Sequence, residues 1–390
     1  MKFTDMYHGR LALVDLADGT AASVPLSPDC MERGLGGGAL AAVLAEQYPG
    51  AMFFCSGPLV GSYAPASGLM TISCRSSESG GLKHAIHPLG HGAWLRQSGF
   101  DALVVTGRGA IPRIIRCFKG ACFLEDAAEE ASSRAKLRAS LLCRTGKGRA
   151  ALILANCVNT ALPVAAGAEY GSFSSGTLVG PAMRERNILA LCLEGGSHLP
   201  PMPIPLDNPL RRAASVPFGH SPLKAFFQET KLDFASVRNL GLKSAACFHC
   251  PSPCLAWVTT GHNAYLLVAD HGAFTAAAAC GKNIPACLAA CDEAGVDPRI
   301  AGSLLKDVPV EEYSAFLGAA AAPNNDNSVV PPPGEQLTEA ERTALVLGMC
   351  PRLVRRRPGL SRSVFDMVLG KDAAAMLARS ETLLGQEVWI

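Results

Sequence analysis

The chain has 390 residues, of which 49% are hydrophobic and 17% are charged, as expected of a compact globular protein with two or three domains. Its 35 Lys and Arg residues nearly balance its 33 Asp and Glu residues, so the formal net charge is only +2. A chain this close to neutral has no global field to hold nucleic acid or an anionic membrane, which excludes both as general partners.

The cellular compartment is predicted from the lack of targeting signals. Residues 1–10 contain no continuous apolar stretch typical of a signal peptide, and no apolar run approaches the roughly 20 residues that span a bilayer. We therefore expect a cytoplasmic protein without a membrane helix. In that reducing compartment its 15 cysteines should be thiols or metal ligands rather than disulfides.

Strand signals dominate the N-terminal half. A hairpin is predicted over residues 11–26, because Asp18-Gly19 supplies a tight turn between two apolar runs. Further short apolar or β-branched runs, bounded by Gly and Pro, lie at 69–73, 102–106, 111–118 and 151–155. Residues 1–196 are therefore predicted to form a sheet-rich α+β domain.

The pattern then changes from strand to helix. Seven prolines fall within residues 197–222, which predicts a Pro-rich linker because neither a helix nor a central strand tolerates them. Helical patterns follow at 284–294 and 337–347, and Thr338 and Glu341 have the spacing of a capping box. The fold class is thus α+β, with a mainly α-helical C-terminal domain over residues 223–390.

The most specific motif is a group of three cysteines within this second domain. Cys247, Cys250 and Cys254 have C-x2-C-x3-C spacing on a proline-containing turn, so their thiolates could bind three irons of one cubane cluster and leave the fourth iron to a distant ligand. The alternative is a zinc site completed by His249 or His262. The cluster is favoured, because a single triad without a matching second pair is unusual for zinc.

Residues 246–254 resemble the cluster loop of tungsten-containing aldehyde:ferredoxin oxidoreductases. The resemblance extends over most of the chain, in segments that keep the order and spacing of that family. These segments are residues 35–40, 56–68, 92–101, 104–112, 183–191, 292–297 and 345–350.

The resemblance implies two cofactors. Cys350 stands at the position of the fourth cluster ligand, so Cys247, Cys250, Cys254 and Cys350 would hold one [4Fe-4S] cluster. A tungsten or molybdenum bis-molybdopterin would be held by the residues at the family's pterin positions, namely Arg75, Asp292, Gly295 and Asp297. The implied activity is oxidation of a small aldehyde to an acid, with electrons passed to ferredoxin. The protein could form a homo-oligomer. No catalytic residue is assigned.

The departures from the family pattern lie on the pterin side. Residues 175–180 lack the arginine that would pair with a pterin phosphate, and residues 88–89 are Pro-Leu in place of Gly-Gly. Leu266 replaces an acidic residue and cannot take a proton, while Leu345 replaces an aspartate. The segment between the last two family motifs, residues 299–349, is also shorter than in typical members. The alternatives are therefore a non-catalytic electron-transfer or accessory protein, and a protein in which the cluster only stabilises the fold.

A run of arginines follows the fourth cysteine. Arg352, Arg355, Arg356 and Arg357 concentrate positive charge beside the expected cluster, which predicts a surface for an acidic electron carrier such as ferredoxin. The alternative is a solvated basic turn.

Overall fold

The computed structural model places most of the chain. It describes residues 3–75, 80–87, 89–127, 150–155, 179–196, 204–215, 242–252, 254–259, 265–268, 283–294, 305–320, 336–384 and 388–389, with a few single positions between these ranges. Strands prevail up to residue 194 and helices from residue 284 onward, which confirms the predicted α+β class. Within this part of the chain, every helix is too short or too polar to cross a membrane.

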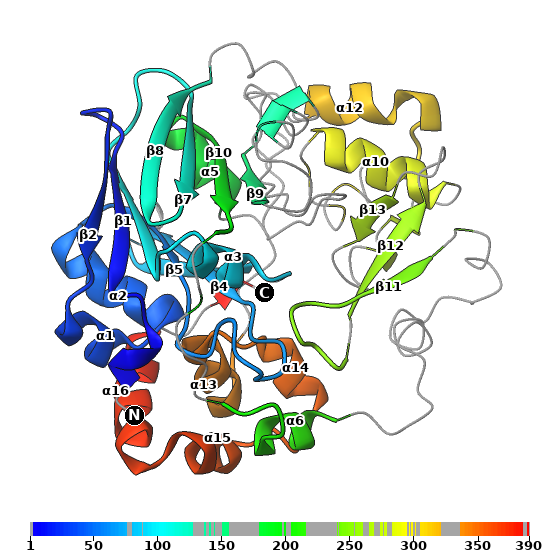
Figure 1. The fold of residues 1–390 in the computed structure, drawn as a ribbon. Helices are drawn as coiled ribbons and strands as arrows, with labels where there is room; N and C mark the ends of the chain where they lie inside the picture. Colours follow the sequence, from blue (N-terminus) through cyan, green and yellow to red (C-terminus); the bar gives the residue numbers. More distant parts are fainter. Residues whose placement is uncertain are drawn as a thin grey trace.

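A seven-stranded mixed sheet organises the N-terminal region (Figure 1). Its strands are, in spatial order, β14 (Val388–Trp389), β5 (Leu82–His87), β4 (Met70–Arg75), β3 (Met52–Cys55), β6 (Ala102–Thr106), β1 (Arg10–Asp15) and β2 (Thr20–Pro25). The predicted hairpin is present as the antiparallel pair β1 and β2, and β1 also pairs in parallel with β6. The last strand, β14, comes from the C-terminus and pairs in parallel with β5.

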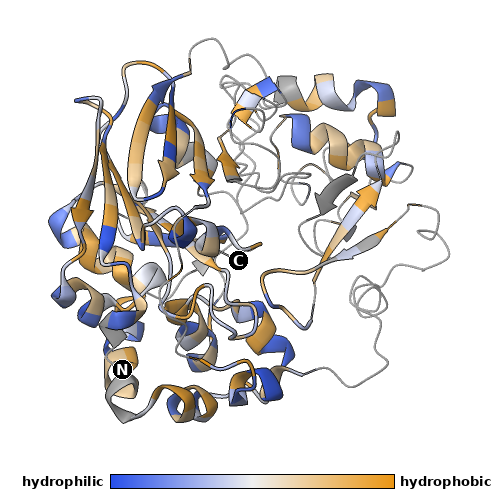
Figure 2. Cartoon of the chain, viewed as in Figure 1, coloured by the Kyte–Doolittle hydropathy of each residue, from blue (hydrophilic) through white to orange (hydrophobic). Residues whose placement is uncertain are grey.

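A second, four-stranded sheet packs against the first. Its order is β8 (Ala121–Asp126), β7 (Arg113–Phe118), β10 (Ile188–Glu194) and β9 (Ala150–Leu154). Inward-facing residues of both sheets form one buried core, in which Val14 and Phe54 of the first sheet join Ile115 and Leu191 of the second. Figure 2 shows the inner strands of both sheets as mainly hydrophobic, because buried cores lie on both of their faces, whereas the edge strand β2 is largely exposed.

Helices cover the face of the large sheet that points away from the small one. They are α1 (Pro28–Gly34), α2 (Gly37–Gln47) and the C-terminal α13 (Glu339–Leu347), α14 (Pro351–Arg356), α15 (Arg362–Leu369) and α16 (Lys371–Leu383). On the side between the sheets lie α3 (His91–Gln97) and α5 (Val179–Glu185), and α6 (Pro209–Ala214) packs on α15. Residues 336–384 thus share a core with the N-terminal region.

A third unit carries the cysteine motif. Its small antiparallel sheet has the order β11 (Lys243–Ala245), β12 (Leu255–Thr259) and β13 (Tyr265–Val268), and α10 (Ile284–Ala294) and α12 (Tyr313–Ala320) pack beside it (Figure 1). The predicted helix 284–294 coincides with α10. The predicted division into domains at residues 197–222 stays a prediction, although α6 lies within that range.

The end of α13 shows how sequence positions the site. The helix begins with the predicted capping box, in which Thr338 and Glu341 each accept a backbone N–H from the other. It ends at Gly348, whose φ of 82° is in the left-handed region that favours glycine. This turn delivers Cys350 to the start of α14.

Candidate functional site

The cysteine motif forms a tight loop between β11 and β12. The Cys250 amide donates to the Cys247 carbonyl at 2.9 Å, and His249 between them adopts a positive φ of 52°. This turn folds the loop back on itself, so that Cys247 and Cys254 are buried and Cys250 is half-buried.

Cys350 reaches the same site from the other end of the fold. Its amide donates to the carbonyl of Ala66 at 3.1 Å, and its side chain is buried. Ala66 belongs to the loop of residues 56–68, which joins β3 to β4. The fourth cysteine is therefore positioned by the N-terminal sheet as well as by α13.

The thiols of Cys247 and Cys250 are influenced by the other cysteines of the proposed set. Burial, followed by the neighbouring Cys254, Cys350 and Cys250, raises the pKa of Cys247 well above its usual range. Burial and then Cys350 raise the pKa of Cys250 to about 12. In the other direction, the amides of Leu89 and Ser252 donate to the sulfur atoms of Cys247 and Cys250 and favour their thiolates.

A zinc ion and an iron–sulfur cluster require different arrangements of their thiolates. Among the described side chains, no three His, Cys, Asp or Glu residues come together closely enough to hold one metal ion. A zinc ion requires its thiolates at about 2.3 Å from the metal, whereas a cluster separates its ligands by its own iron and sulfide atoms. His249, one of the two expected zinc ligands, uses Nδ1 to donate to the Ser62 carbonyl at 3.0 Å.

Aromatic rings and a glycine cover the loop. His249 stacks on Tyr63 with ring centroids 5.7 Å apart and an interplanar angle of 7°. The His249 ring also stacks on Phe248, with ring centroids 4.3 Å apart. A Cβ atom at Gly68 would lie 2.5 Å from the Phe248 Cβ. The close approach of these two segments therefore requires a glycine.

A buried ion pair stabilises the loop of residues 56–68. Arg96 and Asp101 are both buried, with Arg96 Nε 3.5 Å from Asp101 Oδ1. Arg96 Nη1 also donates to the carbonyls of Pro58 and Val60, at 3.2 and 2.9 Å. The pair thus fixes the loop of residues 56–68, whose Ala66 accepts the hydrogen bond from Cys350. Sequence reasoning missed it, and the only signal was a charged pair within the apolar segment 92–101.

Of the four expected pterin-binding residues, the structure describes Arg75 and Asp292. Arg75 is exposed at the end of β4, where its Nη1 donates to the Gly80 carbonyl at 2.9 Å. Asp292 is half-buried in α10. Gly295 and Asp297 lie outside the described residues, as do residues 175–178 and the side chain of Leu266.

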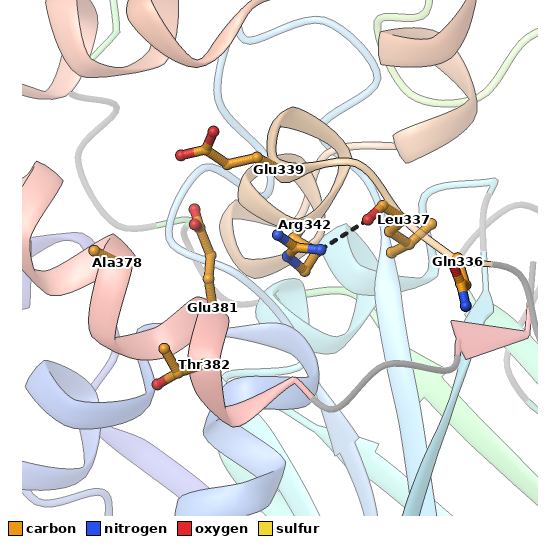
Figure 3. A pocket seen from close by; sticks show the side chains of 7 residues that line it. All are labelled: Gln336, Leu337, Glu339, Arg342, Ala378, Glu381 and Thr382. Atoms are coloured by element: carbon orange, nitrogen blue, oxygen red, sulfur yellow. Dashed lines mark hydrogen bonds between the residues drawn. The ribbon is translucent and has the colours of Figure 1, made fainter.

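An open pocket of about 640 Å³ lies elsewhere, between α13 and α16 (Figure 3). It is at the N-terminal end of α13, whereas Cys350 follows the C-terminal end. Its polar groups already have partners: Arg342 Nη1 donates to the Leu337 carbonyl at 2.8 Å, and Glu381 accepts from Thr343 and Arg362. We therefore assign no catalytic role to this pocket.

Comparisons with known proteins agree with the resemblance predicted from the sequence. Residues 11–195 match the aldehyde ferredoxin oxidoreductase N-terminal domain. Among curated proteins none matches. A similar solved structure is the active site complex BamBC of benzoyl coenzyme A reductase with 1,5-dienoyl-CoA, which has a TM-score of 0.61 and 15% sequence identity. The similarity covers 81% of this chain and 60% of that one, and at this identity it shows a common fold. The predicted resemblance is thus confirmed over residues 11–195, which match the N-terminal domain of the aldehyde ferredoxin oxidoreductase family.

Proposed function

We propose that this protein is an electron-transferring oxidoreductase in which Cys247, Cys250, Cys254 and Cys350 hold one [4Fe-4S] cluster. The observation that supports the proposal best is the convergence of four mutually interacting thiols from two segments about 100 residues apart in sequence. A group of four thiolates has the donor chemistry that such a cluster takes. When bound, the cluster supplies one-electron transfer.

The residues around the thiols suit this role. Burial of Cys247, Cys254 and Cys350 excludes water from the site, and solvent exposure is one of the factors that set a cluster's reduction potential. The amides of Leu89 and Ser252 donate to ligand sulfurs, which is a second such factor. Because the pKa values of Cys247 and Cys250 are raised, binding of a cluster to these two thiols must release protons.

A second candidate function is oxidation of a small aldehyde to an acid at a tungsten or molybdenum bis-molybdopterin, with ferredoxin as electron acceptor. The matching N-terminal family domain favours it. Arg75 offers an exposed guanidinium for a phosphate, and Asp292 offers a carboxylate for ring nitrogens. Both candidates share the cluster and differ in the pterin.

Metal analysis of anaerobically purified protein separates these functions. About four irons per chain without tungsten or molybdenum supports electron transfer alone, and about four irons with either metal supports the enzyme. Zinc without iron would overturn both.

A pair of variants tests the ligand assignment. Cys350→Ser should abolish the visible absorbance of the cluster and lower the iron content, because one iron loses its thiolate. Cys55→Ser is the matched control: it removes a buried thiol of β3 that takes no part in the site, and should keep the iron. Full iron content in Cys350→Ser would contradict the assignment.

A further inference from the structure

Two cysteines face each other across the hairpin of β7 and β8. Cys117 and Cys122 are direct partners in the antiparallel register, next to the closing pair Phe118 and Ala121. The turn consists of Lys119 and Gly120, with φ values of 49° and 75°, as in a two-residue type I′ turn. The hairpin places the two sulfur atoms 3.7 Å apart.

The register makes a covalent bond between these sulfurs geometrically accessible. In a two-residue hairpin the closing pair is hydrogen-bonded, so the next pair along is the non-hydrogen-bonded kind, with Cα atoms about 4.5 Å apart. Disulfides occur with Cα separations of about 4.4 to 6.8 Å. Side-chain rotation with a small backbone adjustment would therefore bring Cys117 and Cys122 to bonding distance.

The two thiols differ in exposure and in hydrogen bonding. Cys122 lies on the edge strand β8 and is 9% exposed, whereas Cys117 on the inner strand β7 is fully buried. The Cys117 thiol donates to the Cys122 sulfur, and this hydrogen bond, followed by burial, raises the pKa of Cys117.

We propose that Cys117 and Cys122 form a redox-active dithiol that closes to a cross-strand disulfide when the protein meets a peroxide. The Cys122 thiolate attacks one oxygen of hydrogen peroxide, whose O–O bond breaks to give a sulfenic acid and, with a proton, water. The Cys117 sulfur then attacks the Cys122 sulfur, the S–O bond breaks, and a second water leaves. Two thiols lose two electrons and two protons, and one peroxide becomes two waters. This inference is independent of the proposed function.

Tryptic mapping tests the proposal on the native full-length chain. Trypsin cleaves after Arg116 and Lys119, so Cys117 leaves in the peptide 117–119 and Cys122 in the peptide 120–134. After treatment with hydrogen peroxide and alkylation of the remaining thiols, the two peptides should be found joined, two hydrogens lighter than their sum. Dithiothreitol should separate them.

Variants identify the partners and make the test decisive. Cys117→Ser should abolish the joined peptide and leave Cys122 as an overoxidised or alkylated residue. Cys192→Ser is the matched control, because Cys192 is buried on the opposite face of the same sheet, and the joined peptide should persist. Recovery of both wild-type peptides singly, at a peroxide dose that oxidises Cys122 to sulfinic acid, would overturn the proposal.

Discussion

Among single residues, Arg96 connects the N-terminal sheet to the cysteine site. Replacing it with Met would leave the buried Asp101 carboxylate without its cation, which typically lowers the free energy of unfolding by about 3 to 5 kcal/mol. Urea denaturation would measure this loss. Arg33→Met is the control, because Arg33 pairs with Glu46 at the surface and should matter far less. Equal effects of the two substitutions would contradict a special role for Arg96.

A buried histidine predicts how stability depends on pH. Burial lowers the pKa of His84 to about 4 from its usual 6.5, and its Nδ1 lies 2.8 Å from Ser73 Oγ. Between pH 6.5 and pH 4 the histidine is protonated in the unfolded chain and neutral in the folded one. The free energy of unfolding should therefore fall by about 1.4 kcal/mol per pH unit down to pH 4. Above pH 6.5 this contribution is constant.

Urea denaturation at pH 7 and pH 5 checks this expectation. His84→Asn keeps a polar group near Ser73 but does not titrate, so the variant should lose less stability between the two pH values than the wild type. The same pH dependence in both proteins would assign the effect to other groups.

The residues of the cysteine site differ in how far the sequence revealed them. The spacing of Cys247, Cys250 and Cys254 indicated a shared site, and the structure brings them together. Cys350 could be paired with them only through the family resemblance, because a lone cysteine has no local signal. Arg96 was not foreseen, since a charge in an apolar segment does not say which distant carbonyls it will contact.

At the scale of elements, the turn after α13 controls the approach of Cys350. An Ala at Gly348 would be strained at a φ of 82°, and its Cβ would lie 2.2 Å from Val60 Cγ2. A left-handed conformation costs a residue other than glycine roughly 1 to 2 kcal/mol. We expect Gly348→Ala to lower the free energy of unfolding by more than this, and to lower the iron content by shifting Cys350. Gly50→Ala separates the two causes, because Gly50 has a φ of 79° with nothing within 4 Å.

Measurements on both glycine variants would give a clear result. Urea denaturation should show a larger loss of stability in Gly348→Ala than in Gly50→Ala, and iron analysis should show a loss only in the former. Unchanged iron in a folded Gly348→Ala protein would show that this turn does not position the ligand.

The predicted elements were most accurate where the signal was local. The Asp18-Gly19 hairpin, strand 102–106 and the capping box of α13 all follow from a few adjacent residues, and all are present. Strand β14 was not predicted, because two residues near the C-terminus form a strand only by pairing with β5, about 300 positions earlier. Non-local pairing of this kind leaves no periodic pattern in the sequence.

For the whole molecule, the fold brings distant parts of the chain into one core around the site. Leu35, Leu59 and Leu69 of the N-terminal region pack with Leu345 and Leu353 of the C-terminal helices. The cysteine loop packs against this core through Cys250 and against the core of the third unit through Cys247 and Cys254. The site therefore forms only when these parts have folded together, which the order of motifs in the sequence does not show.

The same assembly places the predicted basic run beside the cysteine loop. Arg355 contacts the buried Glu341 at 2.6 Å, and Arg357 Nη2 donates to Ser252 Oγ at 3.3 Å, so both arginines are engaged within the protein. The positive charge of Arg356 acts on the Cys250 thiol and favours its thiolate. We propose that the predicted basic run attracts an acidic ferredoxin to the cluster, and Arg352 and Arg356 are the pair chosen for the test because Arg356 acts on a ligand thiol and Arg352 precedes it by one helical turn.

Replacing Arg352 and Arg356 together by Gln should slow electron exchange with an acidic ferredoxin at low salt by about tenfold, the lower end of electrostatic steering. Stopped-flow measurement over a salt series should show the difference shrinking as the Debye length falls to about 10 Å at 0.1 M. Arg108→Gln with Lys119→Gln removes the same charge from exposed positions of the N-terminal region and should leave the rate nearly unchanged. If this control slows exchange equally, net charge rather than position beside the cluster governs the encounter, and the arginines form only a solvated turn.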